Sequence, residues 1–598
     1  MDILSELNPV QQNAVQLVNG PVLVLAGPGS GKTRVLTHRV AYLIHAKNIS
    51  PRNILAVTFT NKAAREMRER LVQLVGEARV QDLTIGTFHA TCARFLRRDG
   101  ERIGLGKGFI IYDDEDQTAL MKQILKELNL DDKKYRPGAV LGAIGKAKND
   151  LIGPDAYVPP SYWHEAVARA YKKFQARLAE NNAVDFDDLI METVRLWREN
   201  ADILERYQNR FAYLHVDEFQ DTNIAQYALM KLLADKQQNL FCVGDEDQSI
   251  YKFRGADFRN VMRLRQDFPN ARVVLLEQNY RSTKTILDAA QSIIRKNSAR
   301  HEKNLWTENP PGIPVSVVEA YNEEEEAQIV VDEIVRLTRR DAPAERLYHP
   351  RDIAIFYRTN AQSRVLEDAL VRRGMPYRLV GATRFYQRRE VKDLLAFLRL
   401  AYNPGDSIAF YRVINVPARG VGKKTIDDLQ YWSQRLDQVP YAVLKKIQTE
   451  DDGPKTEDGA DSSTVHRPPS VPTFDSRSTK SLRAFLNLID ELRAAQSSRK
   501  LMELYDLILE KTGYEHYARD GTPEGEDRWA NVMELRNVTK SFSSDSAEIA
   551  LGQFLEEVAL VADIDSYDER ADAPTLMTLH TAKGLEFPVV FIIGLEEG

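Results

Sequence analysis

The 598-residue sequence has few cysteines, no long apolar run and no excess of positive charge. Its two cysteines, Cys92 and Cys242, cannot form a disulfide framework and exclude metal sites that need four thiolates. The longest apolar stretches, such as 589–595, are far shorter than the roughly 20 residues of a membrane span. The first residues, MDILSELNPV, lack the basic and apolar regions of a secretory signal. We therefore expect a cytoplasmic protein without a membrane segment.

The net charge of −6 means that any nucleic acid would be bound by local basic patches. At roughly 150 residues per domain, the length predicts about four domains. Short apolar runs followed by polar loops and helical patterns are typical of parallel strands covered by helices, and two groups of them predict two α/β domains. The runs are 21–26, 54–60, 213–216, 240–243 and 272–276, then 315–318, 353–357, 377–380, 575–579 and 589–593.

Two long tracts, 108–189 and 386–549, show apolar residues at helical spacing and few strand signals, which predicts helical insertions. Within the second tract, residues 449–480 contain almost nothing that could form a core. We expect that stretch to be a flexible loop.

A glycine-rich segment, AGPGSGKT at 26–33, follows an apolar run and precedes a helical pattern. Glycines allow backbone N–H groups to face phosphate oxygens, a following lysine bridges the β- and γ-phosphates, and a threonine hydroxyl holds Mg²⁺. The usual pattern begins with glycine, where this chain has alanine. The predicted nucleotide site comprises Ala26, Gly27, Pro28, Gly29, Ser30, Gly31, Lys32, Thr33 and Arg34.

Two acidic segments follow apolar runs farther along the chain. In VDEFQD, we expect Asp217 to bind Mg²⁺ with Thr33, and Glu218 to activate the attacking water. In VGDEDQSIYKFRG, Gln248 is placed to sense the γ-phosphate. Lys32 and Asp217 are 185 positions apart, so a folded insertion must separate strands of the same sheet.

Together these segments resemble superfamily-one DNA helicases of the UvrD/PcrA/Rep group. LNPVQQNAV resembles the glutamine motif of that family, which implies that Gln11 reads adenine. QNYRS implies that Tyr280 stacks on adenine and that Arg281 binds phosphate. LMTLHTAKGLEFPVVFI resembles a motif that lines both ATP and DNA, and it implies that Glu586 contacts the ribose.

The same resemblance implies a DNA-binding surface. VTFTNKAAREM and TIGTFHA are similar to two motifs that touch single-stranded DNA, and PARGVGKKT is similar to a hairpin loop that lies on duplex phosphates. The implied contacts are Phe59, Asn61, Lys62, Thr87, His89, Tyr251, Phe253, Arg254, His580, Gly420, Gly422, Lys423 and Thr425. Phe253 stands where several relatives carry tryptophan.

The resemblance implies an α/β fold with two RecA-like P-loop NTPase motor domains, each interrupted by a mostly helical insertion. The implied segments are motor domain one at 1–107 and 190–280 with insertion 108–189, and motor domain two at 281–385 and 550–598 with insertion 386–549. The implied function is an ATP- and Mg²⁺-dependent helicase that moves 3′ to 5′ on single-stranded DNA and unwinds 3′-tailed duplex. We expect a role in DNA repair at the nucleoid, as a monomer or dimer on DNA, with repair proteins as candidate partners.

Other functions stay open: a subunit of a recombination helicase–nuclease complex, an ATP-gated DNA clamp, or a small-molecule kinase or GTPase. The nearest candidate for a guanine-reading motif, residues 61–64, has alanine where the carboxylate belongs. Relatives continue into a last motif whose arginine completes the γ-phosphate site, and the 598 residues hold no counterpart. We therefore expect a truncated chain that hydrolyses ATP slowly.

Overall fold

A computed structural model describes most of the chain and divides it into two compact units. Unit 1 comprises Met1–Phe88, Glu205–Arg384 and Val561–Gly598, and unit 2 comprises His89–Leu204 and Phe385–Leu560. The described residues are 3–251, 255–257, 259–297, 302–338, 348–380, 385–451, 472, 474–519, 523–540, 542, 547–559 and 572–596. The finer division into motor domains and insertions stays a prediction.

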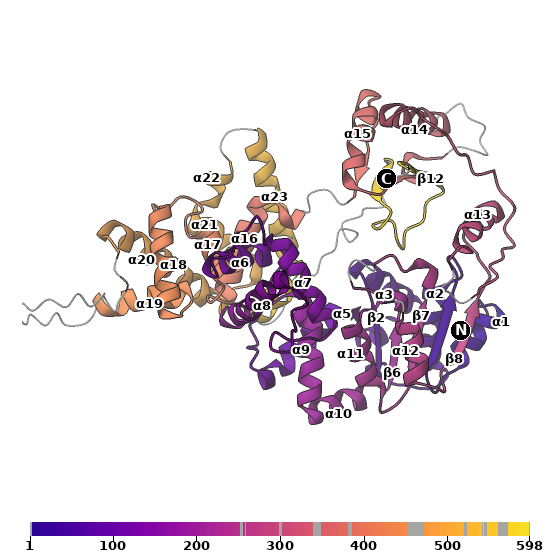
Figure 1. The fold of residues 1–598 in the computed structure, drawn as a ribbon, viewed down its shortest axis with the longest axis horizontal. Coiled ribbons are helices and arrows are strands. Elements are labelled where there is room, and N and C mark those ends of the chain that lie inside the picture. The colour runs from indigo at the N-terminus through magenta and orange to yellow at the C-terminus, as the bar shows by residue number, and fades with distance from the viewer. Residues whose placement is uncertain are drawn as a thin grey trace, which may run out of the picture. The chain divides into compact units, whose positions relative to one another are not determined.

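Unit 1 contains a six-stranded parallel sheet with the strand order β3-β2-β6-β7-β1-β8 (Figure 1). The bounds are β1 Val22–Ala26, β2 Ile54–Thr58, β3 Thr84–Thr87, β6 Tyr213–Val216, β7 Leu240–Gly244 and β8 Arg272–Leu276. Every residue of β1, β2 and β7 is buried, because helices cover both faces of a parallel sheet. The α/β class predicted from the apolar runs is confirmed.

Helices α1, α2 and α3 supply buried side chains to one core beneath this sheet. The helices of this part of unit 1 are α1 Pro9–Gln16, α2 Lys32–His45, α3 Asn61–Val75, α4 Glu77–Gln81, α11 Ile224–Ala234 and α12 Asn260–Asp267. Alternate residues of β1 point into this core, where Val22 and Val24 are fully buried. The carboxyl end of β1 leads directly into the glycine-rich loop and α2, and so positions the predicted phosphate site.

A second parallel sheet of unit 1 has the strand order β10-β11-β9-β12. Its elements, with the neighbouring helices, are α13 Lys284–Ile294, α14 Glu323–Thr338, β9 Ile353–Tyr357, α15 Ser363–Arg372, β10 Arg378–Leu379, β11 Thr575–Thr578 and β12 Val589–Ile592. Helices α14 and α15 bury apolar side chains against β9. The strand predicted at 315–318 is wrong: this stretch is irregular and Val317 is 94% exposed. An apolar run forms a strand only where a neighbour offers a hydrogen-bonding edge, and none pairs with it among the described residues.

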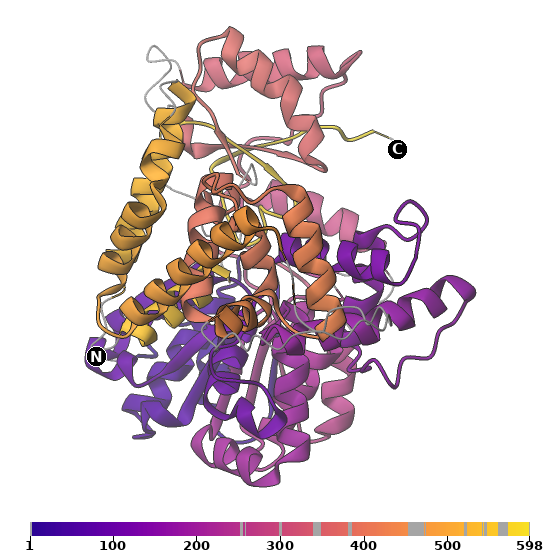
Figure 2. The same ribbon diagram turned by 90° about the vertical axis from the view of Figure 1, so that its left-hand side faces the viewer.

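Unit 2 is mainly helical (Figure 2). Its helices are α5 Phe88–Asp99, α6 Asp114–Glu127, α7 Pro137–Asn149, α8 Tyr162–Glu180, α9 Phe186–Glu199, α10 Ala201–Arg210, α16 Arg389–Tyr402, α17 Ser407–Val413, α18 Lys423–Leu436, α19 Pro440–Asp451, α20 Ser476–Gln496, α21 Leu501–Thr512, α22 Tyr514–Ala518, α23 Pro523–Lys540 and α24 Ala547–Ala559. A pair of two-residue strands, β4 Ile110–Ile111 and β5 Ala183–Val184, accompanies them. The chain crosses between the units within α5 and α10.

Two apolar clusters form the core of unit 2. One is built largely from α16, α20 and α21. The other is built from α6, α7 and α8. The ends of the predicted loop 449–480 are helical, since 449–451 belong to α19 and 476–480 to α20. Residues 452–471 and 473 lie outside the described residues.

Candidate nucleotide site

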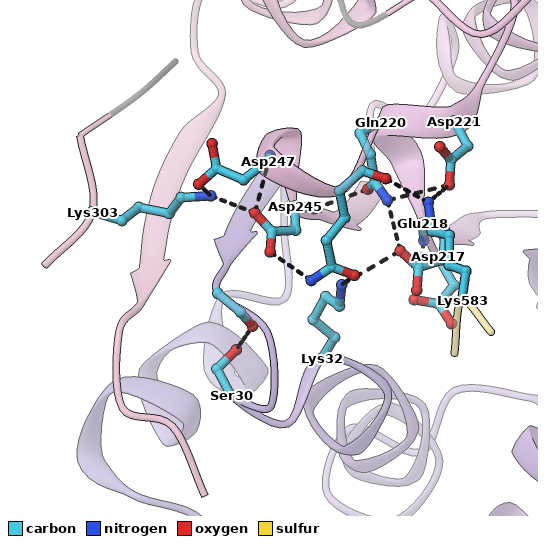
Figure 3. Close-up of polar contacts among 12 residues, drawn as sticks. Ser30, Lys32, Asp217, Glu218, Gln220, Asp221, Asp245, Asp247, Lys303 and Lys583 are labelled. Atoms are coloured by element: carbon cyan, nitrogen blue, oxygen red, sulfur yellow. Dashed lines mark hydrogen bonds and ion pairs between the residues drawn. The ribbon is translucent and has the colours of Figure 1, made fainter. Parts of the chain in front are cut away.

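The glycine-rich loop joins β1 to α2 and adopts left-handed backbone conformations at two positions. Gly29 has a φ of 64° and Gly31 a φ of 85°, values that residues with a Cβ rarely adopt. The Ser30 hydroxyl donates to the Gly27 carbonyl at 2.7 Å and closes the loop (Figure 3). The first N–H groups of a helix have no partner within it, so the loop and the start of α2 can surround a phosphate.

The segment after β8 lies against this loop. The Tyr280 N–H donates to the Gly29 carbonyl at 2.9 Å, and the Asn279 side-chain amide donates to the Pro28 carbonyl at 2.7 Å. A Cβ on Gly29 would lie only 2.7 Å from the Cβ of Arg281, so this position must be glycine. The predicted phosphate loop and the predicted Tyr280–Arg281 pair are therefore neighbours within unit 1.

Lys32 begins α2, and its ammonium group lies between two of the predicted catalytic side chains. The Nζ atom is 3.4 Å from a Glu218 carboxylate oxygen and 3.3 Å from the Gln248 amide oxygen. Burial alone would lower the pKa of Lys32, but the carboxylates of Glu218, Asp245 and Asp217 raise it above its ordinary value. Lys32 is thus a charged, incompletely satisfied cation, as a phosphate-binding lysine should be.

Asp217 and Glu218 follow β6 directly, and their environments separate their pKa values. Burial, and then the charge of Glu218, raise the pKa of Asp217 to about 7. Burial also disfavours the charged form of Glu218, but Lys32 and Lys583 outweigh this effect and lower its pKa. Glu218 has a φ of 49°, a left-handed conformation that costs energy in a non-glycine residue. Glu218 is therefore ionised and held in a strained turn, a state suited to a general base.

The residues predicted to hold Mg²⁺ fit a hard divalent cation. Asp217 is 4% exposed, and among the described residues no lysine or arginine forms an ion pair with it. A buried carboxylate without a cation is costly, and a divalent ion would remove that cost. Thr33 is the second residue of α2 and supplies a hydroxyl oxygen. Mg²⁺ is commonly held by one or two protein oxygens together with substrate phosphates, and these two residues match that arrangement.

Gln11 lies beside the phosphate loop, and its side-chain amide makes one hydrogen bond through its oxygen and one through its nitrogen. Its oxygen accepts the Asn8 N–H at 3.0 Å, and its nitrogen donates to the Ser30 carbonyl at 3.0 Å. An amide has two acceptor positions and two N–H groups, so one of each is left. One donor beside one acceptor is the combination that the hydrogen-bonding edge of adenine requires, and adenine recognition by Gln11 stays a prediction.

Tyr280 and Arg281 have defined partners beside this amide. The Tyr280 hydroxyl accepts from the Asn8 side chain and donates to Gln278, both at 2.7 Å. The Tyr280 side chain is 49% exposed, so the ring is open to a ligand. Arg281 forms an ion pair with Glu586, the residue expected at the ribose.

Lys583 connects the 576–592 motif to the catalytic residues (Figure 3). Its ammonium group forms an ion pair with Asp221 and donates to the Gln248 carbonyl at 2.7 Å. Burial raises the pKa of Asp221 to about 6, although Lys583 opposes the shift. The Gln248 main chain and the loop of Glu218 are therefore both tied to the motif that also contains His580.

The remaining predicted nucleotide residues lie around the loop. Ala26 is the last residue of β1, and Arg34 forms an exposed ion pair with Glu6 at 2.9 Å. Of the predicted DNA contacts in unit 1, Phe59 packs edge-on against Phe88 with ring centroids 5.6 Å apart. Thr87 is buried at the end of β3.

Other predicted DNA contacts lie at the start of α3 and beside Lys583. Asn61 and Lys62 begin α3, and the Lys62 ammonium is 3.8 Å from Glu66. The Tyr251 hydroxyl donates to the His580 carbonyl at 3.0 Å, and their rings lie 6.4 Å apart. The structure thus brings Tyr251 and His580 together.

Unit 2 contains the other predicted DNA contacts. Burial lowers the pKa of His89 to about 4, so this imidazole is neutral. Gly420 has a φ of 77°, and Gly422 precedes the exposed Lys423 at the start of α18. The buried Thr425 hydroxyl lies 2.9 Å from that of Ser478, which joins the start of α18 to the start of α20.

Phe253 and Arg254 lie outside the described residues.

Sequence reasoning missed several side chains that complete the site. Gln220 donates to the Glu218 carboxylate at 2.7 Å and accepts the Asp245 N–H at 2.8 Å. Lys303 contacts Asp245 from a different part of the chain. Gln220 lies in a motif already recognised and could have been identified there, whereas a single lysine in a polar stretch gives no signal.

The parallel sheets flanked by helices, with the glycine-rich loop between β1 and α2, define a P-loop nucleoside triphosphatase fold. Residues 7–269 match the family described as the UvrD/REP helicase N-terminal domain, and residues 274–598 match the UvrD-like helicase C-terminal domain. The chain belongs to the UvrD/REP helicase family.

Similar proteins support this assignment over the full length of the chain. The chain is 46% identical to the ATP-dependent DNA helicase PcrA of Bacillus subtilis over 613 aligned residues, which cover 100% of this chain and 78% of that protein. It is 45% identical to PcrA of Staphylococcus aureus strain Mu50, with the same coverage. PcrA of Leuconostoc citreum is 44% identical, with 99% and 77% covered.

Among the described residues, the helices are all too short or too polar to cross a membrane.

Proposed function

We propose that this chain couples ATP hydrolysis at the unit 1 site to 3′-to-5′ movement on single-stranded DNA and to the separation of duplex. The chain is an ATP-dependent DNA helicase of the UvrD/REP family. The observation that carries the proposal is the position of Lys32, which lies between Glu218 and Gln248 beside a loop contacted by Tyr280 and its neighbours. We expect 3′-tailed DNA as substrate, at the nucleoid, with repair proteins as partners.

Each side chain has a specific task in this proposal. The triphosphate lies on the glycine-rich loop, Lys32 neutralises the β- and γ-phosphates, and Thr33 and Asp217 would hold Mg²⁺. The cation would supply further neutralisation of the phosphate charge. Glu218 accepts the proton of the attacking water, since its pKa is held low and its carboxylate is oriented by Gln220.

The nucleoside would occupy the adjacent surface. Tyr280 offers its ring to adenine, Gln11 offers one donor and one acceptor to the base edge, and Glu586 lies near the expected ribose. Arg281 would exchange its ion pair with Glu586 for a phosphate. Because Glu586 belongs to the 576–592 motif, the loss of its ion pair with Arg281 would couple nucleotide binding to the position of that motif.

Lys583 provides a route from nucleotide to DNA. It holds the Gln248 main chain and Asp221 on one side, and it lies in the motif of His580 on the other. Bases stacked on aromatic side chains gain roughly 1–3 kcal/mol each. Separating one duplex step costs on average about 1.4 kcal/mol, so stacking on residues such as Phe59 and Tyr251 can offset melting.

The test is ATP hydrolysis by the purified chain with and without single-stranded DNA, together with strand displacement on 3′- and 5′-tailed duplexes. We expect DNA to stimulate hydrolysis and only the 3′-tailed duplex to be unwound. Hydrolysis that is indifferent to DNA would contradict the proposal. DNA-stimulated hydrolysis without displacement of either duplex would support the clamp instead.

A further inference from the structure

A short segment after α13 lies against the end of β8 and the phosphate loop. The Trp306 N–H donates to the Glu277 carbonyl at 3.1 Å, and the Asn279 N–H donates to the Trp306 carbonyl at 2.7 Å. These bonds form a parallel bridge between residues 278 and 306. A Cβ on Gly27 would clash with a methyl group of Leu305, so the segment also packs on the first glycine of the loop. Residue 303 is thereby held close to the nucleotide site.

Lys303 extends from this segment into a buried acidic pair (Figure 3). Its ammonium nitrogen is 2.5 Å from an Asp245 carboxylate oxygen and 3.1 Å from an Asp247 carboxylate oxygen. The side chains of Lys303 and Asp245 are 1% and 0% exposed. A lysine is rarely buried to this extent unless it is paired, and this one is paired twice.

Asp245 is the hub between Lys303 and the catalytic residues. Its carboxylate accepts the Gln248 side-chain N–H at 2.7 Å, and its own N–H donates to Gln220 at 2.8 Å. Because the nitrogen of the Gln248 amide is fixed on Asp245, its oxygen faces Lys32 at 3.3 Å. One N–H of that amide remains available to a ligand, since an amide nitrogen carries two.

Without Lys303, the buried Asp245 carboxylate would lack its closest cation. A carboxylate in that state either takes up a proton or attracts another cation. The Asp245 charge already acts on Lys32, because it contributes to the raised pKa of that lysine. Removing Lys303 would therefore draw Lys32 away from the phosphates and release the Gln248 amide.

We propose that Lys303 is a positioning residue for ATP hydrolysis. Lys303 holds the Asp245 carboxylate in place. Asp245 in turn orients the Gln248 amide toward the γ-phosphate and leaves Lys32 available to the triphosphate. Lys303 lies in the part of the chain matched by the C-terminal domain family, whereas Asp245 and Gln248 lie in the part matched by the N-terminal domain family. The contact therefore connects the two matched halves of the chain. This inference rests on the role that the proposed function gives to Gln248.

The first experiment compares Lys303→Met with wild type in DNA-stimulated ATP hydrolysis. Methionine keeps the length of the side chain and removes the charge. We expect kcat to fall about 10-fold or more while KM for ATP changes less than about threefold, because a misoriented Gln248 affects the reaction more than ground-state binding. The control is Lys236→Met, which removes a partly exposed lysine paired with Glu205 in the same unit, and which should keep wild-type values.

The second experiment tests rescue, which a merely structural lysine would not show. Asp245→Asn removes the carboxylate but keeps an oxygen that can accept the Gln248 N–H. In the Lys303→Met/Asp245→Asn double variant the fully buried Asp245 charge is removed together with the Lys303 charge, and only the Asp247 carboxylate, whose side chain is 9% exposed, loses its partner. This variant should therefore fold even if Lys303→Met does not. We expect its kcat to exceed that of Lys303→Met severalfold, and a crystal structure to show the Gln248 amide oriented as in wild type.

The outcomes distinguish a failure of this inference from a failure of the proposed function. Wild-type kcat in Lys303→Met would overturn the inference, as would a double variant that is folded but no more active than the single variant. Gln248→Ala is measured alongside. If Gln248→Ala loses activity while Lys303→Met does not, only the inference fails. If Gln248→Ala has wild-type activity, the proposed role of Gln248 fails, and the inference fails with it.

Discussion

Each unit contains a largely buried lysine beside an acidic side chain, Lys148 in unit 2 and Lys32 in unit 1, and the two lysines differ in how tightly they are held. In unit 2, Lys148 is fully buried, with its ammonium nitrogen 2.6 Å from Asp185 and 2.8 Å from Asp188. In unit 1, Lys32 is 12% exposed and its nearest acceptors, on Glu218 and Gln248, lie at 3.3–3.4 Å. A hydrogen-bonded ammonium usually makes contacts of 2.7–2.9 Å, so Lys148 is satisfied by the protein and Lys32 is not. The comparison distinguishes a structural cation from one that awaits a ligand.

The largest expected effect is on the acidic partner of Lys32. Glu218→Gln removes the general base, and we expect hydrolysis to fall about 10²–10⁴-fold while ATP and single-stranded DNA still bind. The measurement is single-turnover hydrolysis together with equilibrium binding. Asp188→Asn, which changes a partner of Lys148, is the matched variant and should leave the hydrolysis rate of the folded protein unchanged. Undiminished hydrolysis in Glu218→Gln would show that another residue acts as the base.

Exchanging each lysine for methionine tests the comparison itself. Lys148→Met leaves two buried carboxylates without their cation, and we expect it to destabilise unit 2 by about 3–5 kcal/mol. Lys32→Met should lower ATP affinity at least about 10-fold and change stability by less than about 1 kcal/mol, since its contacts in the free protein are long. Urea unfolding and binding of a fluorescent ATP analogue measure the two effects. Equal losses of stability in the two variants would remove the distinction.

A substitution at the proposed adenine site should have a smaller effect, which is a loss of ATP affinity. Tyr280→Ala should weaken ATP binding about 10-fold, because stacking of a base on an aromatic ring contributes roughly 1–3 kcal/mol. Tyr280→Phe keeps the ring and loses the hydroxyl bonds to Asn8 and Gln278, and it should bind ATP within about threefold of wild type. The measurement is isothermal titration. Equal affinities of Tyr280→Ala and wild type would show that the base binds elsewhere.

A further prediction concerns the pH dependence of the stability of unit 2. Burial, and then the charge of Asp188, raise the pKa of Asp185 to about 7, against about 3.9 in an unfolded chain. The folded state therefore holds a proton that the unfolded state has released, and stability falls as the pH rises from about 4 to 7. Asp185→Asn keeps the N-terminal cap of α9, for which asparagine is equally suited, and removes this titration.

The readout for Asp185→Asn is the melting temperature at pH 5.5 and at pH 8. We expect the drop between these values to be smaller in the variant than in wild type. Parallel curves for the two proteins would mean that Asp185 does not titrate in this range.

Much of the fold could be predicted because parallel strands leave a strong local signal. The runs 213–216, 272–276 and 353–357 coincide with β6, β8 and β9. β6 and β9 are mostly buried, and a strand covered on both faces is mainly apolar. β8 is an edge strand in which Val273 and Leu275 are exposed, so its apolar run is not explained by burial on both faces. The run 315–318 has the same composition but no strand formed, because pairing depends on a neighbour that local sequence does not specify.

Some residues of the candidate site could likewise be predicted from local sequence, and others could not. The glycine-rich loop, Asp217 and Glu218 were predictable, because their chemistry requires particular residue types next to a strand. Lys303 was not, since its role depends on a carboxylate 58 positions away and on a bridge between residues 278 and 306. Contacts of this kind are set by tertiary packing and leave no periodic pattern.

The central claim is that one ATP molecule is shared by the glycine-rich loop and the Tyr280 segment. A crystal structure of the chain with a non-hydrolysable ATP analogue and Mg²⁺ tests it most directly. The account predicts the triphosphate on residues 27–33, with the Lys32 ammonium moved from Glu218 onto phosphate oxygens and the adenine ring stacked on Tyr280. A nucleotide whose base lies away from Tyr280, or a Lys32 ammonium that keeps its contacts with Glu218 and Gln248 and touches no phosphate, would contradict it.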